Sequence, residues 1–196
     1  GSSRTDTGVH AFGQVAHVDL DTNLNCQKIK DALNGNLPWY CRVSEVINVE
    51  ANFNARFNAI SREYLYQCYT GKSILFRNQS WLIKELDLQF LNKLAKNFTG
   101  KLDFLSFSKF RKELRNTECF IFSAFWEKKD CMYTFHIKAN RFLHHMIRYI
   151  VGSMIGVYEK RMSKKDFLLL IKEPRKDVKI FKAPARGLFL NKVNYE

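Results

Sequence analysis

The residues best suited to chemistry lie near the start of the chain, in the stretch RTDTGVHA at residues 4–11. An Asp between two Thr residues and before a Gly is typical of a tight turn, in which the hydroxyls bond to backbone or carboxylate. Arg4 stands two residues before Asp6 and offers a guanidinium that binds phosphate or carboxylate in bidentate fashion. Without further context, the pattern also fits a surface turn with no catalytic role.

Asp6, Thr7 and Gly8 also spell the triplet of the aspartic proteases. Those enzymes need two such aspartates sharing one proton. The sequence contains a single DTG, so a protease of this kind would have to be a homodimer. Arg4 before the triplet and His10 after it differ from the apolar strands that frame it in proteases. A dimeric aspartic protease is therefore a minor alternative.

A second group interleaves basic and aromatic side chains, with FNARFNA at residues 53–59 followed by REYLY at 62–66. Arg side chains clamp phosphates, and a Tyr ring stacks on an unpaired base. Strict alternation predicts a strand with Tyr64 and Tyr66 on one face. We expect Tyr66 to pack in the core, while Tyr64 fits a core role and a base-binding role equally well.

A third group is KANRFLHHMIR at residues 138–148. The apolar periodicity predicts a helix from about residue 141 to 156. Adjacent side chains on a helix diverge by about 100°, so His144 and His145 are poor joint ligands, and we expect no metal. Arg148 lies on a largely apolar helix, where an unpaired charge is costly, so we expect it to have an anionic partner.

The elements that must position these residues form a mixture of strands and helices. Ser163 is expected to cap the last helix, and Asn25 the first. The order favours an α+β fold with a mostly antiparallel central sheet and helices on one face. We predict strands at residues 13–20, 43–49, 62–69, 118–126, 131–138 and 188–195, and helices at residues 25–33, 88–98, 141–156 and after 163.

The charge balance points to a polyanionic partner. Lys and Arg total 32 against 19 Asp and Glu, a net charge of +13, which creates a field that attracts nucleic acid or an anionic membrane surface. The five cysteines show no zinc-site spacing, so we expect reduced thiols in a cytoplasmic protein. No apolar run is long enough to span a bilayer, and the start does not resemble a signal peptide.

Six motifs together resemble the tRNA pseudouridine synthase A family. Besides RTDTGVHA, the sequence matches that family in order and over essentially its whole length. The resemblance implies an enzyme that isomerises uridine to pseudouridine in tRNA. The further matching stretches are NLP (36–38), FNARFNAISREYLY (53–66), DFLSFS (103–108), KANRFLHHMIRYIVGSM (138–154) and ARGLFL (185–190).

The resemblance also implies roles for individual residues. Asp6 matches the catalytic aspartate, which either attacks C1′ or promotes glycal formation. Tyr64 matches the tyrosine that stacks on the target base or accepts the C5 proton, and Arg148 matches the basic partner of the aspartate. Leu188 matches the apolar wall of the uracil pocket, and Arg4 the arginine that holds the flipped nucleotide. The substrate-binding set is completed by His10, Arg56, Arg62 and His145.

The family further implies a substrate, a fold and an assembly. The target is the anticodon stem-loop of tRNA, at uridines 38, 39 and 40, and the enzyme is a homodimer that needs no cofactor. The pseudouridine synthase fold has two related subdomains around a cleft. We assign residues 1–70 to the remainder of the first subdomain and residues 71–196 to the second.

One departure from the family concerns the start. Members carry a segment before the RTD motif, with a YDGT-like start and a GWQ-like stretch, and neither is present in this sequence. We therefore expect an exposed sheet edge and a cleft that is open on one side. The main alternative to an isomerase is a catalytically silent fragment that binds tRNA.

Overall fold

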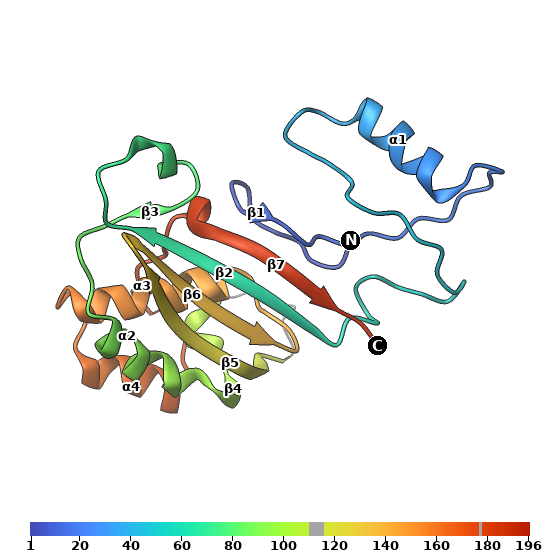
Figure 1. Ribbon diagram of the computed structural model, residues 1–196. Helices are drawn as coiled ribbons and strands as arrows, with labels where there is room; N and C mark the ends of the chain where they lie inside the picture. Colours follow the sequence, from blue (N-terminus) through green and yellow to red (C-terminus); the bar gives the residue numbers. More distant parts are fainter. Residues whose placement is uncertain (110–115, 177) are drawn as a thin grey trace.

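A computed structural model describes residues 1–109, 116–176 and 178–196. It combines one mixed sheet with four α-helices and four short 3-10 turns, drawn in Figure 1. The strands are β1 (His10–Ala11), β2 (Ser61–Tyr69), β3 (Trp81–Leu82), β4 (Gly100–Asp103), β5 (Glu118–Lys129), β6 (Met132–Ala139) and β7 (Leu188–Asn194). The helices are α1 (Cys26–Asn36), α2 (Leu88–Ala95), α3 (Met146–Tyr158) and α4 (Lys164–Lys172), and the 3-10 turns are η1 (Ile74–Phe76), η2 (Lys96–Phe98), η3 (Leu105–Phe107) and η4 (Ala185–Gly187).

The sheet has seven strands in the order β1-β7-β2-β6-β5-β4, with β3 paired to the end of β2. The long central pairs are antiparallel, whereas β1 runs parallel to β7 and β3 parallel to β2. Strand β2 is bonded on both sides, with Tyr64 opposite Ile137 of β6 and Leu190 of β7. Because β7 also pairs with β1, the last strand of the chain lies beside the first. This pairing holds the RTD motif, which precedes β1, at the sheet.

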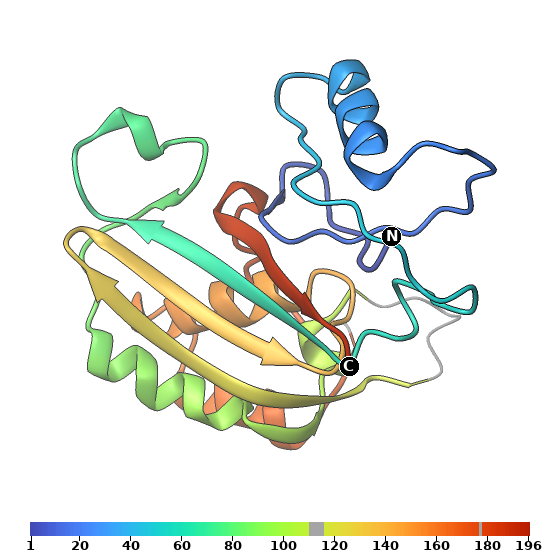
Figure 2. The ribbon, with the colours of Figure 1, turned by 45° about the vertical axis from the view of Figure 1, so that its right-hand side comes forward.

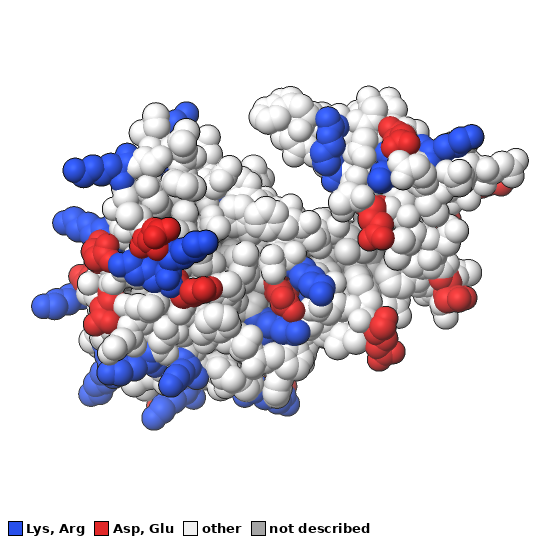
Figure 3. All heavy atoms as spheres, in the orientation of Figure 1, with Lys and Arg blue, Asp and Glu red and all other residues white. Residues whose placement is uncertain are grey.

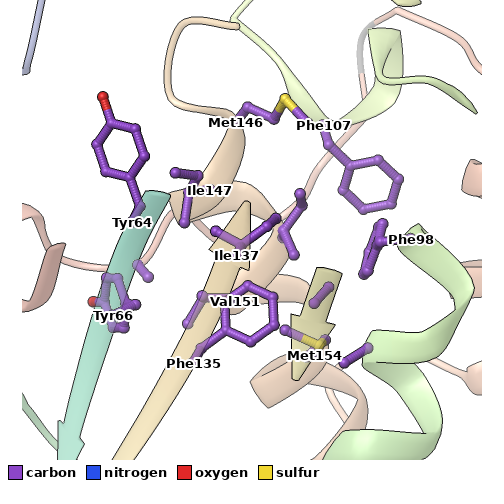
Figure 4. Close-up of a cluster of buried hydrophobic side chains, with 14 of the residues drawn as sticks. Tyr64, Tyr66, Phe98, Phe107, Phe135, Ile137, Met146, Ile147, Val151 and Met154 are labelled. Carbon is purple, nitrogen blue, oxygen red and sulfur yellow. The ribbon is translucent and has the colours of Figure 1, made fainter. Parts of the chain in front are cut away.

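Three helices cover one face of this sheet, as Figures 1 and 2 show for α2, α3 and α4. Between them and the strands lies a single apolar core, part of which is drawn in Figure 4. Tyr66 and Phe135 from the strands meet Val151 and Met154 from α3 there, and all four are fully or almost fully buried. The predicted α+β fold with a mostly antiparallel sheet and helices on one face is confirmed.

Several local predictions are confirmed as well. Asn25 caps α1, its side chain accepting a hydrogen bond from the backbone N–H of Lys28. Ser163 caps α4. Its hydroxyl donates a hydrogen bond to the Asp166 carboxylate and accepts one from the backbone N–H of Asp166. The hairpin between β5 and β6 turns at residues 130 and 131, slightly later than expected. The division of the chain at residue 70 stays a prediction.

Two strand predictions are wrong. Residues 13–20 and 43–49 contain valines, which favour strands, but neither segment is in a strand in the structure. A strand needs a neighbour that satisfies its backbone groups, and no described strand pairs with either segment. The first helix is also longer than predicted, since α1 continues through Asn36.

The predicted helix at 141–156 begins later than expected. Helix α3 starts at Met146 because His145 adopts a left-handed backbone conformation with φ of 64°, which a right-handed helix cannot include. The residues from Arg141 to His145 instead form a connection from β6, closed by a bond from Met146 N–H to the Leu143 carbonyl. This difference changes the directions of both histidines.

Residues 12–60, which we call the N-terminal segment, lie largely outside the core. Helix α1 has no buried residue and stands apart from the sheet in Figure 2. Several large apolar side chains of the segment are exposed, including Trp39 at 85%, Phe57 at 79% and Tyr40 at 75%. Within the described residues, no helix combines the length and apolar character that a membrane span requires.

A close backbone crossing fixes the segment between α4 and β7. A Cβ atom added at Gly152 of α3 would lie 1.9 Å from the carbonyl oxygen of Phe181. One helical turn earlier, the Arg148 carbonyl accepts a hydrogen bond from the backbone N–H of Ala183 at 3.0 Å. Only glycine lets residues 181–183 approach the helix this closely.

We expect Gly152→Ala to lower the free energy of unfolding by about 1–3 kcal/mol, because the new methyl group forces the backbone at Phe181 away. The control is Gly156→Ala on the same helix, where an added Cβ meets nothing within 4 Å. That change should be neutral or stabilise the protein by up to about 1 kcal/mol through helix propensity. Urea denaturation measures both variants, and equal stability of the two would contradict the crossing.

Candidate active site

Asp6 occupies a tight turn, as its neighbours predicted. The backbone N–H of Val9 donates to the carbonyl of Asp6 at 3.1 Å, which closes a four-residue turn. Gly8, the third residue of this turn, has φ of +82°, the value that a type II turn requires and that favours glycine. The turn leaves the Asp6 side chain only 17% exposed.

The turn is attached to the edge of the sheet. Just after it, His10 and Ala11 form β1 beside Phe189 and Leu190 of β7. Before it, Ser2 bonds to Val15 through its backbone N–H. These bonds hold both ends of the turn, so the position of Asp6 depends on a strand from the far end of the chain.

Arg148 is the ion-pair partner of Asp6. Its Nη1 lies 2.7 Å from Asp6 Oδ2, and its Nε donates to the carbonyl of Ala183, also at 2.7 Å. The Arg148 side chain is 11% exposed, so both charges are largely removed from water. A buried ion pair is stable only when its remaining hydrogen-bonding groups are satisfied, and the Ala183 carbonyl serves that purpose here. The expectation of an anionic partner for Arg148 is confirmed.

His144 and His145 also converge on Asp6. His144 Nε2 lies 3.3 Å from Asp6 Oδ1, and His145 Nε2 lies 3.2 Å from Asp6 Oδ2. The expectation that His144 and His145 are poor joint ligands was wrong, because both residues precede α3 and His145 is left-handed. The three residues place possible metal ligands within 4.8 Å of one another. However, the Arg148 guanidinium already balances the carboxylate charge and opposes a cation, so absence of a metal stays our prediction.

His145 sits in an unusual environment. Its side chain is 11% exposed, and its Nδ1 is buried without a hydrogen-bond partner. Burial is the main cause that lowers the pKa of His145, to about 4, although the charge of Asp6 acts in the opposite direction. Its imidazole is therefore neutral near pH 7.

Tyr64 lies near the same carboxylate. Its ring is buried and meets Phe142 edge-on, with 5.1 Å between ring centres. In Figure 4 its hydroxyl points away from the labelled core side chains, unlike the ring of Tyr66, which lies among them. Burial raises the pKa of Tyr64, and the charge of Asp6 raises it further.

Leu188, the residue expected to form an apolar wall, is the first residue of β7. Leu188 is buried and pairs in register with Tyr66 of β2. Tyr66 donates its hydroxyl hydrogen bond to the carbonyl of Pro184 at 2.8 Å, so it holds the turn before β7 against the sheet. The core role expected for Tyr66 is confirmed.

Two of the candidate arginines differ in their surroundings. Arg62 donates to three backbone carbonyls, those of Ala59, Asn140 and Arg56, at 2.5 to 3.0 Å. The Arg62 side chain therefore fixes the segment that leads into β2. Arg56 is exposed and has its guanidinium over the ring of Phe57, 5.6 Å from its centre.

The other two binding candidates flank the Asp6 turn. Arg4 is exposed at the surface before it. His10 stacks on Phe189 with 4.7 Å between ring centres, and its Nε2 is 3.0 Å from the carbonyl oxygen of Asn78. His10 thus links β1 to the loop after β2. The substrate-binding roles of all these residues stay predictions.

Sequence reasoning missed the backbone contribution to this site. The carbonyl of Ala183 completes the environment of Arg148, and the alanine side chain itself does not signal function. The only available signal for Ala183 was its place two residues before the ARGLFL motif.

Comparison with known proteins identifies the class to which this fold and site belong. A family model described as tRNA pseudouridine synthase matches residues 94–196. A tRNA pseudouridine synthase A from Dictyoglomus thermophilum is 36% identical over 200 residues, covering all of this chain and 81% of that protein. Those from Azobacteroides pseudotrichonymphae and Bacteroides fragilis are 35% and 36% identical, each over 79% of its length. The chain belongs to the tRNA pseudouridine synthase family, whose members are isomerases.

We expect the free energy of unfolding to fall as the pH decreases from about 6.5 toward 4. In the unfolded chain His145 takes up a proton near its ordinary pKa of about 6.5, whereas the folded site resists protonation down to about 4. Stability is thus fully present above this window and is lost as the pH falls through it. His144, Lys182 and Arg148 contribute to that resistance.

Urea denaturation of the native protein and of His145→Gln at several pH values measures this effect. The native protein should lose more stability on acidification than the variant, because Gln does not titrate. An equal loss in both proteins would contradict the assignment to His145.

Proposed function

We propose that this chain isomerises uridine to pseudouridine in the anticodon stem-loop of tRNA, at positions 38, 39 and 40, with Asp6 as nucleophile. The observation that carries the proposal is the 2.7 Å ion pair between Arg148 and Asp6, formed beside Tyr64. A nucleophilic carboxylate must be ionised, and an adjacent guanidinium favours that form.

The proposed reaction exchanges one bond for another at the same sugar carbon. An oxygen of Asp6 bonds to C1′ as the bond from C1′ to N1 breaks, and the electron pair leaves with the uracil. After the uracil rotates, C5 attacks C1′ and releases Asp6. C5 then loses a proton and N1 gains one, so the reaction needs neither a redox partner nor a metal.

The uracil must rotate without escaping, and Tyr64 and Leu188 are proposed to confine it. Both side chains are buried, and they supply an aromatic face and an apolar wall. Because the pKa of Tyr64 is raised, its hydroxyl stays protonated near neutral pH. This favours the stacking role over the role of proton acceptor at C5. A base within the stem-loop must also flip out to reach Asp6.

The charge distribution supports tRNA as the partner. Residues 61–196 contain 27 Lys and Arg against 13 Asp and Glu, whereas residues 1–60 contain five against six. Figure 3 shows many basic side chains, with acidic ones among them, over the body formed by the sheet and its helices, and charges of both signs on the lobe that contains α1. We propose that the body holds the phosphate backbone, with the exposed Arg4 and Arg56 nearest the target nucleotide.

We also propose that the protein is a cytoplasmic homodimer, in which a second copy covers the part of the N-terminal segment around Trp39 and Tyr40. Exposed apolar patches mark interaction surfaces, and this segment exposes Trp39 and Tyr40 while carrying almost no net charge. An apolar surface without a basic excess suits protein rather than RNA. The five free cysteines accord with a reducing compartment.

The competing functions are a silent tRNA-binding fragment and a dimeric aspartic protease. The Asp6 to Arg148 pair argues against both. RNA binding alone does not require a carboxylate surrounded by Arg148, His144 and His145. A protease dyad requires a second carboxylate sharing one proton with Asp6, and here that carboxylate is paired with a guanidinium instead.

Tritium release from tRNA labelled at C5 of uridine tests the proposed reaction. The native protein should release tritium, and Asp6→Asn should lower the rate by at least about 10³-fold, in line with the loss of a covalent nucleophile. Binding of tRNA should survive in the variant. Replacing uridines 38, 39 and 40 in the tRNA should abolish release.

The assay is repeated with a chelator, which should leave the rate unchanged. Equal release by the native protein and Asp6→Asn would refute the role of Asp6. Binding without release by the native protein would favour the silent fragment.

Light scattering during size-exclusion chromatography tests the assembly. The native protein should elute with the mass of two chains, and Trp39→Asp with Tyr40→Asp should shift it toward one chain, because buried charges oppose association. A control variant with Ile74→Asp changes an exposed apolar residue outside the segment and should remain dimeric. A native monomer would contradict the proposal.

A further inference from the structure

The two oxygens of the Asp6 carboxylate have different surroundings. Oδ2 faces two nitrogen atoms, Arg148 Nη1 at 2.7 Å and His145 Nε2 at 3.2 Å. Oδ1 faces His144 Nε2 at 3.3 Å. The His144 side chain is 30% exposed, against 11% for both His145 and Arg148. Oδ2 therefore points to the interior and Oδ1 to the more open side of the site.

The protonation of His145 follows from its contacts. Its imidazole is neutral near pH 7, so it carries one ring proton. A proton on Nδ1 would be a buried donor without an acceptor, and the bare Nε2 would then face the carboxylate oxygen. A proton on Nε2 instead faces the carboxylate charge at Oδ2, 3.2 Å away. The second arrangement is the favourable one.

We propose that His145 is a positioning residue that fixes the plane of the Asp6 carboxylate, so that Oδ1 is the oxygen presented to the sugar. The proposal rests on the proposed function of Asp6 as nucleophile. Arg148 donates a hydrogen bond to Oδ2, and His145 Nε2 lies in polar contact with the same oxygen at 3.2 Å, so Oδ2 is occupied by both groups. Rotation of the carboxylate would break the hydrogen bond from Arg148 and the contact with His145, so the side chain stays in one orientation.

The backbone around His145 is built to place this ring. Its φ of 64° is rare for a residue other than glycine, and such strained conformations persist where the surroundings impose them. Here the bonds from Met146 N–H to Leu143 and from Tyr149 N–H to the His145 carbonyl, both 3.1 Å, hold the turn. The His144 carbonyl also accepts from Lys109 N–H at 2.9 Å.

Two substitutions separate the contact with Oδ2 from the backbone conformation. His145→Asn tolerates the left-handed conformation, but its amide nitrogen reaches only the position of Nδ1. His145→Gln extends its amide to the position of Nε2 and can restore the contact with Oδ2. His136→Gln is the matched control, because His136 lies on β6, stacked on Phe125 and paired with Glu127, away from Asp6.

The measurements are the single-turnover rate of tritium release, the Kd for tRNA, and Tm. His145→Asn should lower the rate by about 10²-fold, the size expected when a reacting group is displaced by about 1 Å, with Kd unchanged. His145→Gln should recover most of this loss, and His136→Gln should behave as the native protein. The order of the variants by reaction rate should differ from their order by Tm.

The proposal would be overturned if His145→Asn reacted at the native rate. It would also be overturned if the rate, the affinity for tRNA and the Tm of this variant all fell in parallel. Equal losses in the Asn and Gln variants at similar Tm would also overturn it, because the restored donor would then have no effect. If the native protein itself releases no tritium, the proposed function fails instead. If the native protein releases tritium and Asp6→Asn does not, the proposed function holds. The His145 variants then test the positioning role separately.

Discussion

The ion pair between Asp6 and Arg148 is the interaction on which the rest of the site depends. Two charges that are 17% and 11% exposed are stable only together, because either one alone would be buried without compensation. Their residues are 142 positions apart, and the pair joins the turn near the start of the chain to the first turn of α3. Every other element of the site either brings these two side chains together or surrounds them.

The sheet supplies the geometry that the ion pair needs. Strand β7 connects the two parts, because it pairs with β1 beyond the Asp6 turn and with β2, which carries Tyr64. The segment before β7 then crosses α3 at Gly152 and delivers the Ala183 carbonyl to Arg148. One stretch near the end of the chain thus positions Asp6, Arg148 and Leu188.

The two parts of the molecule also differ in the charge and polarity of their surfaces. The body of sheet and helices carries the basic excess that suits tRNA, while the N-terminal segment exposes apolar side chains and carries almost no net charge. A cationic surface attracts phosphate through long-range fields, whereas an apolar one is covered best by protein. Belonging to the tRNA pseudouridine synthase family accounts for the first surface, and the proposed dimer accounts for the second.

The sequence by itself determined the features that depend on near neighbours. Gly8 predicted the turn at Asp6, alternation predicted β2, and Asn25 and Ser163 predicted their caps, because each rests on contacts within a few residues. Only the tertiary structure decided which side chains surround Asp6 and which apolar segments become strands. Residues 13–20 and 43–49 contain strand-favouring valines but lack paired neighbours, and the left-handed His145 is imposed by its surroundings. Pairing and burial depend on residues far away in the chain, which local patterns do not encode.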